Sequence, residues 1–338
     1  MRFDDASEMF ERARQMIEGA SSIAVSGHTD PDGDALGSVL AMTLLIEQIW
    51  PGKTVMPLLA NDRPVPANLA FLPAAERLRP AQGSSCSLDL FISVDTPTRA
   101  RLADSGQVLS RASACVSFDH HPAVEDSFDC AYTNPSAASC ADVVLDFADY
   151  LGAQLSHDIA TCLLAGIITD TGRFQYQNTD PHALESASRL VQVGADPSDI
   201  CLHVYQSKTM AQLKLQQVTL DRLALACNDE LAYSYVLQSD FARFGASASD
   251  CDELVDSVRS LGGIKGVLFL RELPEGGFRG NLRSKDASRD VSLIAHRLGG
   301  GGHKMASGFS IAGTAQEAVA RVCEIYADLY LDVEGGVR

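Results

Sequence analysis

Three short apolar runs in the first half of the chain end in ionisable side chains. They are SSIAVSGH at 21–28, LDLFISVD at 88–95 and ACVSFDHH at 114–121. Helical patterns alternate with these runs, and strands that alternate with helices form parallel sheets covered by helices. In open α/β sheets, ligands bind beyond the carboxyl ends of the strands. The sequence therefore predicts an α/β domain whose strand ends deliver their polar side chains to one place.

The loop after the first run is crowded with potential ligands. The stretch GHTDPDGDALGS at 27–38 holds His28, Asp30, Asp32 and Asp34 within seven residues. A turn needs only one or two such side chains. Taken alone, the DPDGD pattern also fits a calcium loop or a turn that caps a helix. The assignment therefore depends on whether other segments bring ligands to the same place.

Three later segments supply such ligands. Asp95 ends the second run, the tripeptide DHH at 119–121 ends the third, and Asp170 lies in the apolar helical pattern LLAGIITDTG. Burying these groups without partners would be costly. Together with the 27–38 loop they offer six or seven ligands, which suits two divalent ions. Mn²⁺ accepts both carboxylates and imidazoles, whereas Mg²⁺ favours oxygen, so Mn²⁺ is preferred and Mg²⁺ stays an alternative. Two such ions form the clamp that phosphoryl hydrolases use.

Charge and cysteine usage narrow the class of protein. The net charge of −17 argues against binding of long nucleic acid, because proteins that neutralise many phosphates usually present a basic face. No apolar run approaches the ~18 residues of a membrane span. The N-terminus reads as an acidic amphipathic helix, so we expect a cytoplasmic protein that contacts no membrane. Its nine cysteines form no CxxC pair, which favours buried, reduced thiols.

The pattern changes in the second half of the chain. Strand-like runs and short helices after the polar turn near 228–230 predict a small α+β domain. We expect a first domain at 1–212, a linker helix or hinge at 213–230 and a second domain at 231–332. The stretch LGGGGHKMASG at 298–308 has glycines that let the backbone approach a phosphate and present N–H donors, although a glycine run also fits a flexible turn.

The order of these motifs resembles that of the DHH phosphoesterases. HTDPDGDALGS, VDT, DHH and GIITDTGRF match the four motifs of that family, and NLRS with LGGGGHKMASG is similar to the DHHA1 domain. The resemblance covers nearly the whole chain. The two-domain size is most similar to the NrnA-type nanoRNases, which degrade very short RNA and dephosphorylate 3′-phosphoadenosine 5′-phosphate (pAp). It implies a DHH domain and a DHHA1 domain with the active site in the cleft between them.

The resemblance also implies roles for individual residues. Asp95 would bridge two ions, Asp119 would orient an imidazole, and His121 would face the scissile phosphate, so His121 and Asp95 are the expected catalytic residues. Asp30 would only shape its loop. The expected metal ligands are His28, Asp32 and Asp95 for one ion and Asp34, Asp95, His120 and Asp170 for the other. The expected substrate-binding residues are His121, Arg283, Ser284, Gly301, Gly302, His303, Lys304 and Ser307.

The implied activity is hydrolysis of short RNA and of pAp by a homodimer. The nearest alternative is a phosphodiesterase for the linear dinucleotides pApA and pGpG. A RecJ-like DNA exonuclease would need further DNA-binding domains, and an inorganic pyrophosphatase would have a different second domain. A catalytically silent nucleotide sensor is the alternative from another class, but none of the expected ligands is missing from the sequence.

Overall fold

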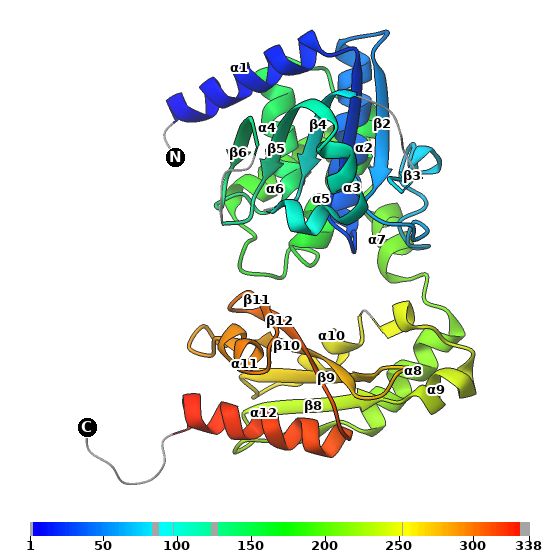
Figure 1. Ribbon diagram of the computed structural model, residues 1–338, viewed down its shortest axis with the longest axis vertical. Helices are drawn as coiled ribbons and strands as arrows, with labels where there is room; N and C mark the ends of the chain where they lie inside the picture. The colour runs from blue at the N-terminus through cyan, green and yellow to red at the C-terminus, as the bar shows by residue number, and fades with distance from the viewer. Residues whose placement is uncertain (1–2, 83–87, 97, 123–127, 252, 332–338) are drawn as a thin grey trace. The chain divides into compact units, whose positions relative to one another are not determined.

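A computed structural model of the chain describes residues 3–82, 88–96, 98–122, 128–251 and 253–331. The chain divides into two compact units, Met1–Ser207 and Lys208–Arg338 (Figure 1). This boundary lies five residues before the predicted end of the first domain at 212. Each unit has its own sheet and its own buried core.

The first unit contains the predicted parallel sheet. Within the described residues its six strands lie in the order β3-β2-β1-β4-β5-β6, and every neighbouring pair is parallel. The strands are β1 (Ser22–Ser26), β2 (Thr54–Leu59), β3 (Arg79–Pro80), β4 (Leu88–Val94), β5 (Ala112–Asp119) and β6 (Cys130–Thr133). The α/β prediction for this half of the chain is confirmed.

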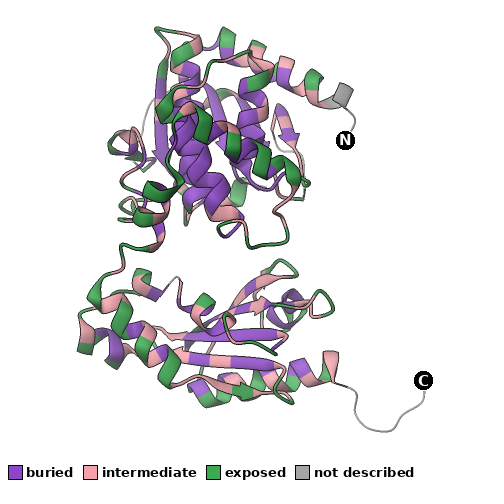
Figure 2. Ribbon diagram, turned by 180° about the vertical axis from the view of Figure 1, so that it is seen from behind, coloured by how far each residue is buried: buried purple, intermediate pink, exposed green. Residues whose placement is uncertain are grey.

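Helices cover both faces of this sheet. They are α1 (Phe3–Gly19), α2 (Gly33–Ile49), α3 (Ala103–Leu109), α4 (Cys140–Tyr150), α5 (His157–Asp170), α6 (Pro181–Val193) and α7 (Pro197–Tyr205). Successive side chains of a strand point to opposite faces. Ile23 and Val25 accordingly pack with α1, α2, α4 and α5, whereas Ala24 packs on the other face with α3. Figure 2 shows the strands and central helices of this unit as buried.

Small residues let α2 and α5 pack closely, which fixes the position of the loop between β1 and α2. A Cβ on Gly37 would lie 2.4 Å from the carbonyl oxygen of Cys162. A Cβ on Gly166 would lie 2.6 Å from Cβ of Ala141 and 2.7 Å from Oδ1 of Asp34. Real Cβ atoms do not approach other atoms so closely, so these two positions require glycine.

Asp146 in α4 makes the stability of the first unit depend on pH. Burial raises the pKa of Asp146 to about 6, although His182, whose Nε2 lies 3.4 Å from Oδ1, opposes the shift. The folded state then holds this proton more tightly than the unfolded chain, so the free energy of unfolding falls as pH rises from about 4 to about 6. Between these two pH values, we expect the free energy of unfolding of Asp146→Asn to decrease by about 1–2 kcal/mol less than that of the wild type. Urea unfolding at both ends of that window measures it, and an unchanged fall in the variant would contradict the prediction.

The second unit is the predicted α+β domain. Its sheet has the order β11-β12-β10-β9-β8-β7 within the described residues, and only the pair β8 and β9 is parallel. The strands are β7 (Ala224–Ala226), β8 (Leu231–Val236), β9 (Gly266–Glu272), β10 (Phe278–Ser284), β11 (Gly301–Gly302) and β12 (Ala306–Ile311). The helices are α8 (Met210–Asp221), α9 (Gln238–Phe244), α10 (Leu254–Arg259), α11 (Val291–Arg297) and α12 (Ala315–Tyr330).

The segment expected as a linker helix or hinge at 213–230 is not one continuous helix. Its helix, α8, ends at Asp221 and belongs to the second unit, and residues 224–226 form the edge strand β7. Cys227, Asn228 and Asp229 then adopt left-handed conformations with φ of 56°, 57° and 62°. These three residues reverse the chain between the antiparallel strands β7 and β8, so a continuous helix cannot pass through them.

The cysteines form no disulfide among the residues that the structure describes. Eight of them are free thiols, and Cys86 lies outside the described residues. No described helix combines the length and the apolar character that crossing a bilayer requires. The last residue of the predicted second domain, at 332, also lies outside the described part of the chain.

Candidate metal centre

The carboxyl ends of β1, β4 and β5 meet at one edge of the sheet. β1 pairs with β2 on one side and β4 on the other, so the strand order reverses between β1 and β4. Such a switch point is where open α/β sheets bind ligands. His28 follows β1, Asp95 follows β4, and Asp119 ends β5 with His120 directly after it. The fold therefore brings the predicted strand-end side chains together.

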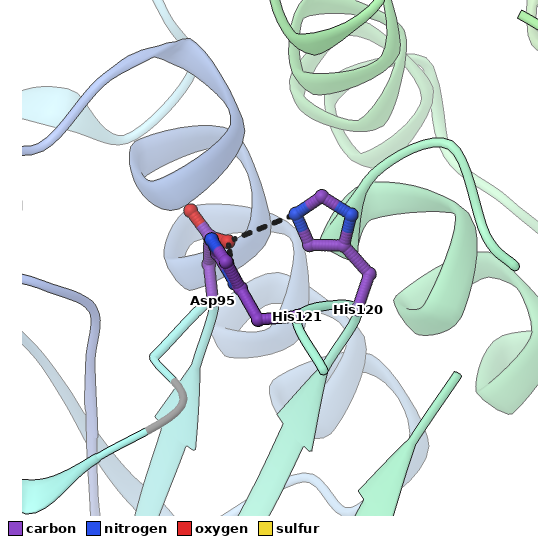
Figure 3. A group of neighbouring side chains, drawn as sticks. All are labelled: Asp95, His120 and His121. Atoms are coloured by element: carbon purple, nitrogen blue, oxygen red, sulfur yellow. Dashed lines mark ion pairs between the residues drawn. The ribbon is translucent and has the colours of Figure 1, made fainter. Parts of the chain in front are cut away.

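Asp95 lies at the centre of this group. Its Oδ2 is 3.4 Å from Nε2 of His28, and its Oδ1 is 3.4 Å from Nε2 of His120 and 3.6 Å from Nδ1 of His121. Figure 3 shows the His120 ring pointing toward Asp95. Asp95 is 2% exposed, and its φ of 53° is uncommon for a residue other than glycine. Strained backbone of this kind concentrates at functional sites.

The N-terminus of α4 holds Asp34. The Cys140 amide donates to Asp34 Oδ2 at 2.6 Å, and the Ala141 amide donates to Oδ1 at 2.8 Å. The hydroxyl of Ser38 donates to Oδ1 at 3.3 Å. Helix N-termini favour negative charge, so these donors fix the orientation of a carboxylate that is almost completely buried.

Asp32 both caps a helix and lies beside the proposed metal ligands. Its Oδ1 accepts hydrogen bonds from the amides of Asp34 and Ala35, each at 3.0 Å, so Asp32 is the N-cap of α2. The same oxygen lies 4.0 Å from Nε2 of His28. Asp32 therefore caps a helix and faces the cluster as well. Asp30, in contrast, pairs with Arg63 at the surface and makes no contact with the cluster among the described residues.

The predicted ligands form three overlapping groups whose donor atoms lie within 4.8 Å of one another. The groups are His28, Asp32 and Asp95; Asp34, His120 and Asp170; and Asp95, His120 and His121. These groups could hold a metal ion, and all six side chains expected as ligands occur in them. His121 also occurs in one of these groups, with Nδ1 3.6 Å from Oδ1 of Asp95, whereas the resemblance implied that it faces the scissile phosphate.

Asp119 orients His121. Its Oδ1 is 2.8 Å from Nδ1 of His121 and also accepts the amide hydrogens of His120 and His121, at 2.8 Å and 3.2 Å. Because an ionised carboxylate only accepts hydrogen bonds, Nδ1 of His121 carries the proton. His121 is thus the imidazole that Asp119 orients. Nε2 is the nitrogen of that ring that stays available to contact a bound ligand.

The carboxylates of the cluster oppose one another's ionisation. Burial, followed by the charges of Asp95 and Asp170, raises the pKa of Asp34 well above its usual range. Burial also raises the pKa of Asp170 to about 7, with the charges of Asp32 and Asp95 acting in the same direction. Four carboxylates at this spacing therefore need positive charge before all of them can ionise.

The imidazoles supply part of that charge. Burial would lower the pKa of His120, but the neighbouring carboxylate of Asp95 and the charges of Asp34 and Asp170 raise it to about 10. Burial also disfavours ionised Asp95, yet the imidazoles of His120 and His28, whose Nε2 atoms lie 3.4 Å from its oxygens, keep its pKa below the usual range. Protonation of the imidazoles would therefore offset the charge of the acids, and a bound cation would do the same in its place.

A divalent ion fits this set of residues. The donors are carboxylate oxygens and imidazole nitrogens, which suit Mn²⁺ and related ions. Oδ1 of Asp95 is buried, and the nearest nitrogens, on His120 and His121, lie 3.4 Å and 3.6 Å away without forming a hydrogen bond with it. A buried carboxylate oxygen without a donor is costly, and coordination would satisfy it. The arrangement therefore supports a metal centre better than a purely structural network.

The predicted serines of the second unit are buried in its own hydrogen-bond network. Ser284 donates to the carbonyl of Asp286 at 2.7 Å and accepts from the same residue's amide at 3.2 Å. Ser307 donates to the carbonyl of Val291 at 2.8 Å. Both hydroxyls therefore stabilise the loops around β10 and β12, and their contact with substrate stays a prediction.

The glycine-rich segment forms a tight hairpin. Gly301 and Gly302 make up β11, and the amide and carbonyl of His303 bond to the carbonyl and amide of Ala306 at 2.7 Å and 3.1 Å. Lys304 lies exposed in the turn. A Cβ on Gly302, whose φ is 140°, would lie 2.6 Å from the backbone of the facing strand. This hairpin and Arg283 on β10 belong to one unit, and a cleft shared with the metal centre stays a prediction.

Sequence reasoning missed two supports of the centre. The backbone amides of Cys140 and Ala141 hold Asp34, and Asn178 donates to Asp170. Ser139 is the N-cap of α4, and a serine in that position predicts only where a helix begins. Asn178 lies in the polar stretch FQYQNTD, which carries no pattern that marks it.

Comparison with known families identifies the class of protein. The model of the DHH family N-terminal domain matches residues 22–167, and that of the DHHA1 domain matches residues 228–328. The two matches fall in the two units described above. The chain belongs to the DHH family of phosphoesterases and carries a DHHA1 domain. Within that family, its two-domain organisation is of the NrnA type.

Individual relatives agree with this assignment. The bifunctional oligoribonuclease and PAP phosphatase NrnA of Bacillus subtilis is 28% identical over 295 residues, which cover 86% of this chain and 89% of that protein. The protein of the same name from Thermus thermophilus is 27% identical and covers 96% of this chain, with 94% of its own length matched. The crystal structure of an exopolyphosphatase-related protein from Bacteroides fragilis has a TM-score of 0.88 at 24% identity, covering 95% of this chain and 97% of that one, and confirms the fold.

Proposed function

We propose that the chain is a two-metal-dependent phosphoesterase. It hydrolyses RNA of about two to five nucleotides, yielding mononucleotides, and it dephosphorylates pAp to AMP. The observation that carries this proposal is the meeting of His28, Asp32, Asp34, Asp95, His120 and Asp170 in overlapping groups at the sheet edge. The relatives named NrnA, which match both units, support the two substrates. Mn²⁺ is the proposed metal because imidazoles belong to the donor set.

Divalent ions, when bound, polarise phosphoryl oxygens and lower the pKa of water. The residues of this chain then have distinct roles. Asp95 belongs to two of the groups and is therefore the residue proposed to be shared by both ions. Asp119 holds the His121 ring by Nδ1, so Nε2 of His121 is the atom proposed to contact the scissile phosphate. A hydrogen bond there stabilises the charge that develops on the phosphoryl oxygens.

The DHHA1 domain is proposed to select short substrates. Arg283 offers a bidentate fork to a phosphate, and the 301–304 hairpin offers backbone N–H groups with His303 and Lys304 beside them. If these groups hold one end of the ligand, only a short chain or a bisphosphate reaches the metal centre. The net charge of −17 acts against longer polyanions as well.

A single substrate panel tests this function. With Mn²⁺, we expect hydrolysis of pAp and of a 5′-phosphorylated RNA trimer, and turnover at least about tenfold slower on an RNA of fifty nucleotides because the acidic protein repels it. Without added metal, after chelation, activity should disappear. The linear dinucleotides pApA and pGpG, pyrophosphate and single-stranded DNA complete the panel. Equal rates on trimer and long RNA, or preferred hydrolysis of pyrophosphate, would contradict the proposal.

A further inference from the structure

Asn178, in the loop between α5 and α6, contacts two separate supports of the metal centre. Its Nδ2 lies 2.8 Å from the carbonyl oxygen of Ala138, 3.1 Å from the carbonyl oxygen of Asp170 and 3.3 Å from Oδ2 of the Asp170 carboxylate. Ala138 lies two residues before α4, whose first amides hold Asp34. One amide group thus connects the segment that holds Asp34 to Asp170 itself.

The chemistry of this contact fixes the orientation of the amide. The three neighbours of Nδ2 are all oxygens, and none of them carries a hydrogen when Asp170 is ionised. Turning the amide by half a rotation would place Oδ1 of Asn178 against these oxygens and remove every donor. The Nδ2 atom therefore faces Ala138 and Asp170, and it shares its two hydrogens among three acceptors.

The oxygen of the Asn178 amide makes no compensating hydrogen bond among the described residues. This atom, Oδ1, is buried. A buried carbonyl oxygen without a donor costs free energy, on the order of 1–3 kcal/mol. Stability alone therefore does not explain an asparagine here. What the side chain supplies is the pair of donors on Nδ2.

We propose that Asn178 is a positioning residue that sets the spacing of Asp34 and Asp170 for a divalent ion held by the group Asp34, His120 and Asp170. The inference rests on the proposed metal-dependent function. Asp170 is the last residue of α5, and its side chain is 27% exposed, so its carboxylate can rotate away unless a donor holds it. Asn178 makes no hydrogen bond, among the described residues, to the group of His28, Asp32 and Asp95. Its loss should weaken one ion and spare the other.

Isothermal titration of the metal-free full chain with Mn²⁺ tests this inference. The variants are Asn178→Asp, which keeps the shape but replaces the donors by an oxygen, and Asn178→Ala. The control is Thr179→Val, which removes a neighbouring buried hydroxyl that has no hydrogen-bond partner among the described residues. Wild type and Thr179→Val should bind two ions alike. In both Asn178 variants, one site should weaken by about 10–100-fold, as loss of a partner that orients a ligand typically does, and the other should stay within about twofold.

Kinetics give a second readout that a merely structural role would not produce. The Mn²⁺ concentration for half-maximal pAp hydrolysis should rise by the same factor, while kcat at saturating Mn²⁺ changes little. Unchanged titrations, or equal weakening of both sites, would overturn the positioning role. Thermal unfolding of the metal-free proteins shows which variant folds, and Asn178→Ala provides the test if Asn178→Asp does not. A wild-type chain that binds no Mn²⁺ would instead refute the proposed function itself.

Discussion

Asp95→Asn is expected to abolish hydrolysis of pAp and of short RNA. Asp95 is the residue shared by the groups that contain His28 and His120, and both of its oxygens face imidazole nitrogens. Replacing one oxygen by an amide removes a ligand from each proposed ion. If the metal stabilises the transition state by several kcal/mol, losing it lowers kcat by about 1,000-fold or more. Steady-state rates with saturating Mn²⁺ measure this loss.

A neighbouring acid provides the matched control for this variant. Asp30 lies in the same motif as Asp32 and Asp34, but its carboxylate pairs with Arg63 at the surface and is 75% exposed. Exposed pairs of this kind contribute little to stability. Asp30→Asn should therefore keep wild-type activity within about twofold. Retained activity in a folded Asp95→Asn protein, or equal losses in both variants, would contradict the assignment of ligands.

Gly37→Ala is expected to cause a large loss of stability in the first unit. The added Cβ would meet the Cys162 carbonyl oxygen at 2.4 Å, and backbone atoms of two buried helices cannot give way cheaply. Overpacking of this kind costs about 1–3 kcal/mol, and a backbone contact belongs at the upper end. For a unit of this size, that lowers Tm by roughly 5–10 °C. Calorimetry of the metal-free protein measures the shift.

Gly19→Ala serves as the control for helix propensity. Gly19 ends α1, and a Cβ there would meet no atom within 4 Å. Because alanine reduces the freedom of the unfolded chain, this variant should be neutral or more stable by up to about 1 kcal/mol. A Gly37→Ala protein as stable as Gly19→Ala would show that α2 and α5 do not pack as closely as described.

The sequence predicted the edge of the sheet where the site lies, because apolar runs that end in ionisable residues can be recognised directly in a sequence. His28, Asp95 and His120 each follow such a strand, and parallel pairing of β1, β4 and β5 brings them together. Asp170 could be predicted for a related reason, since an acid in an apolar helix needs partners. These assignments depend on side-chain type and on periodicity, which a sequence displays directly.

The supports of the site could not be predicted in this way. The amides of Cys140 and Ala141 hold Asp34 through backbone atoms, which every residue except proline possesses. Asn178 acts through a loop whose path depends on the packing of α5 and α6. The left-handed conformation of Asp95 likewise follows from tertiary contacts and has no sequence signal. The edge strand β7 was not predicted, because its three residues, Ala224–Ala226, are equally compatible with a continuation of the preceding helix.

Anomalous diffraction from crystals grown with Mn²⁺ tests the central claim most directly. Two manganese peaks about 3.5–4 Å apart are expected at the carboxyl edge of the parallel sheet. One should contact His28, Asp32 and Asp95, and the other should contact Asp34, His120 and Asp170, with Asp95 touching both. A site without manganese, or a single ion bound elsewhere while these side chains point apart, would contradict a two-metal phosphoesterase.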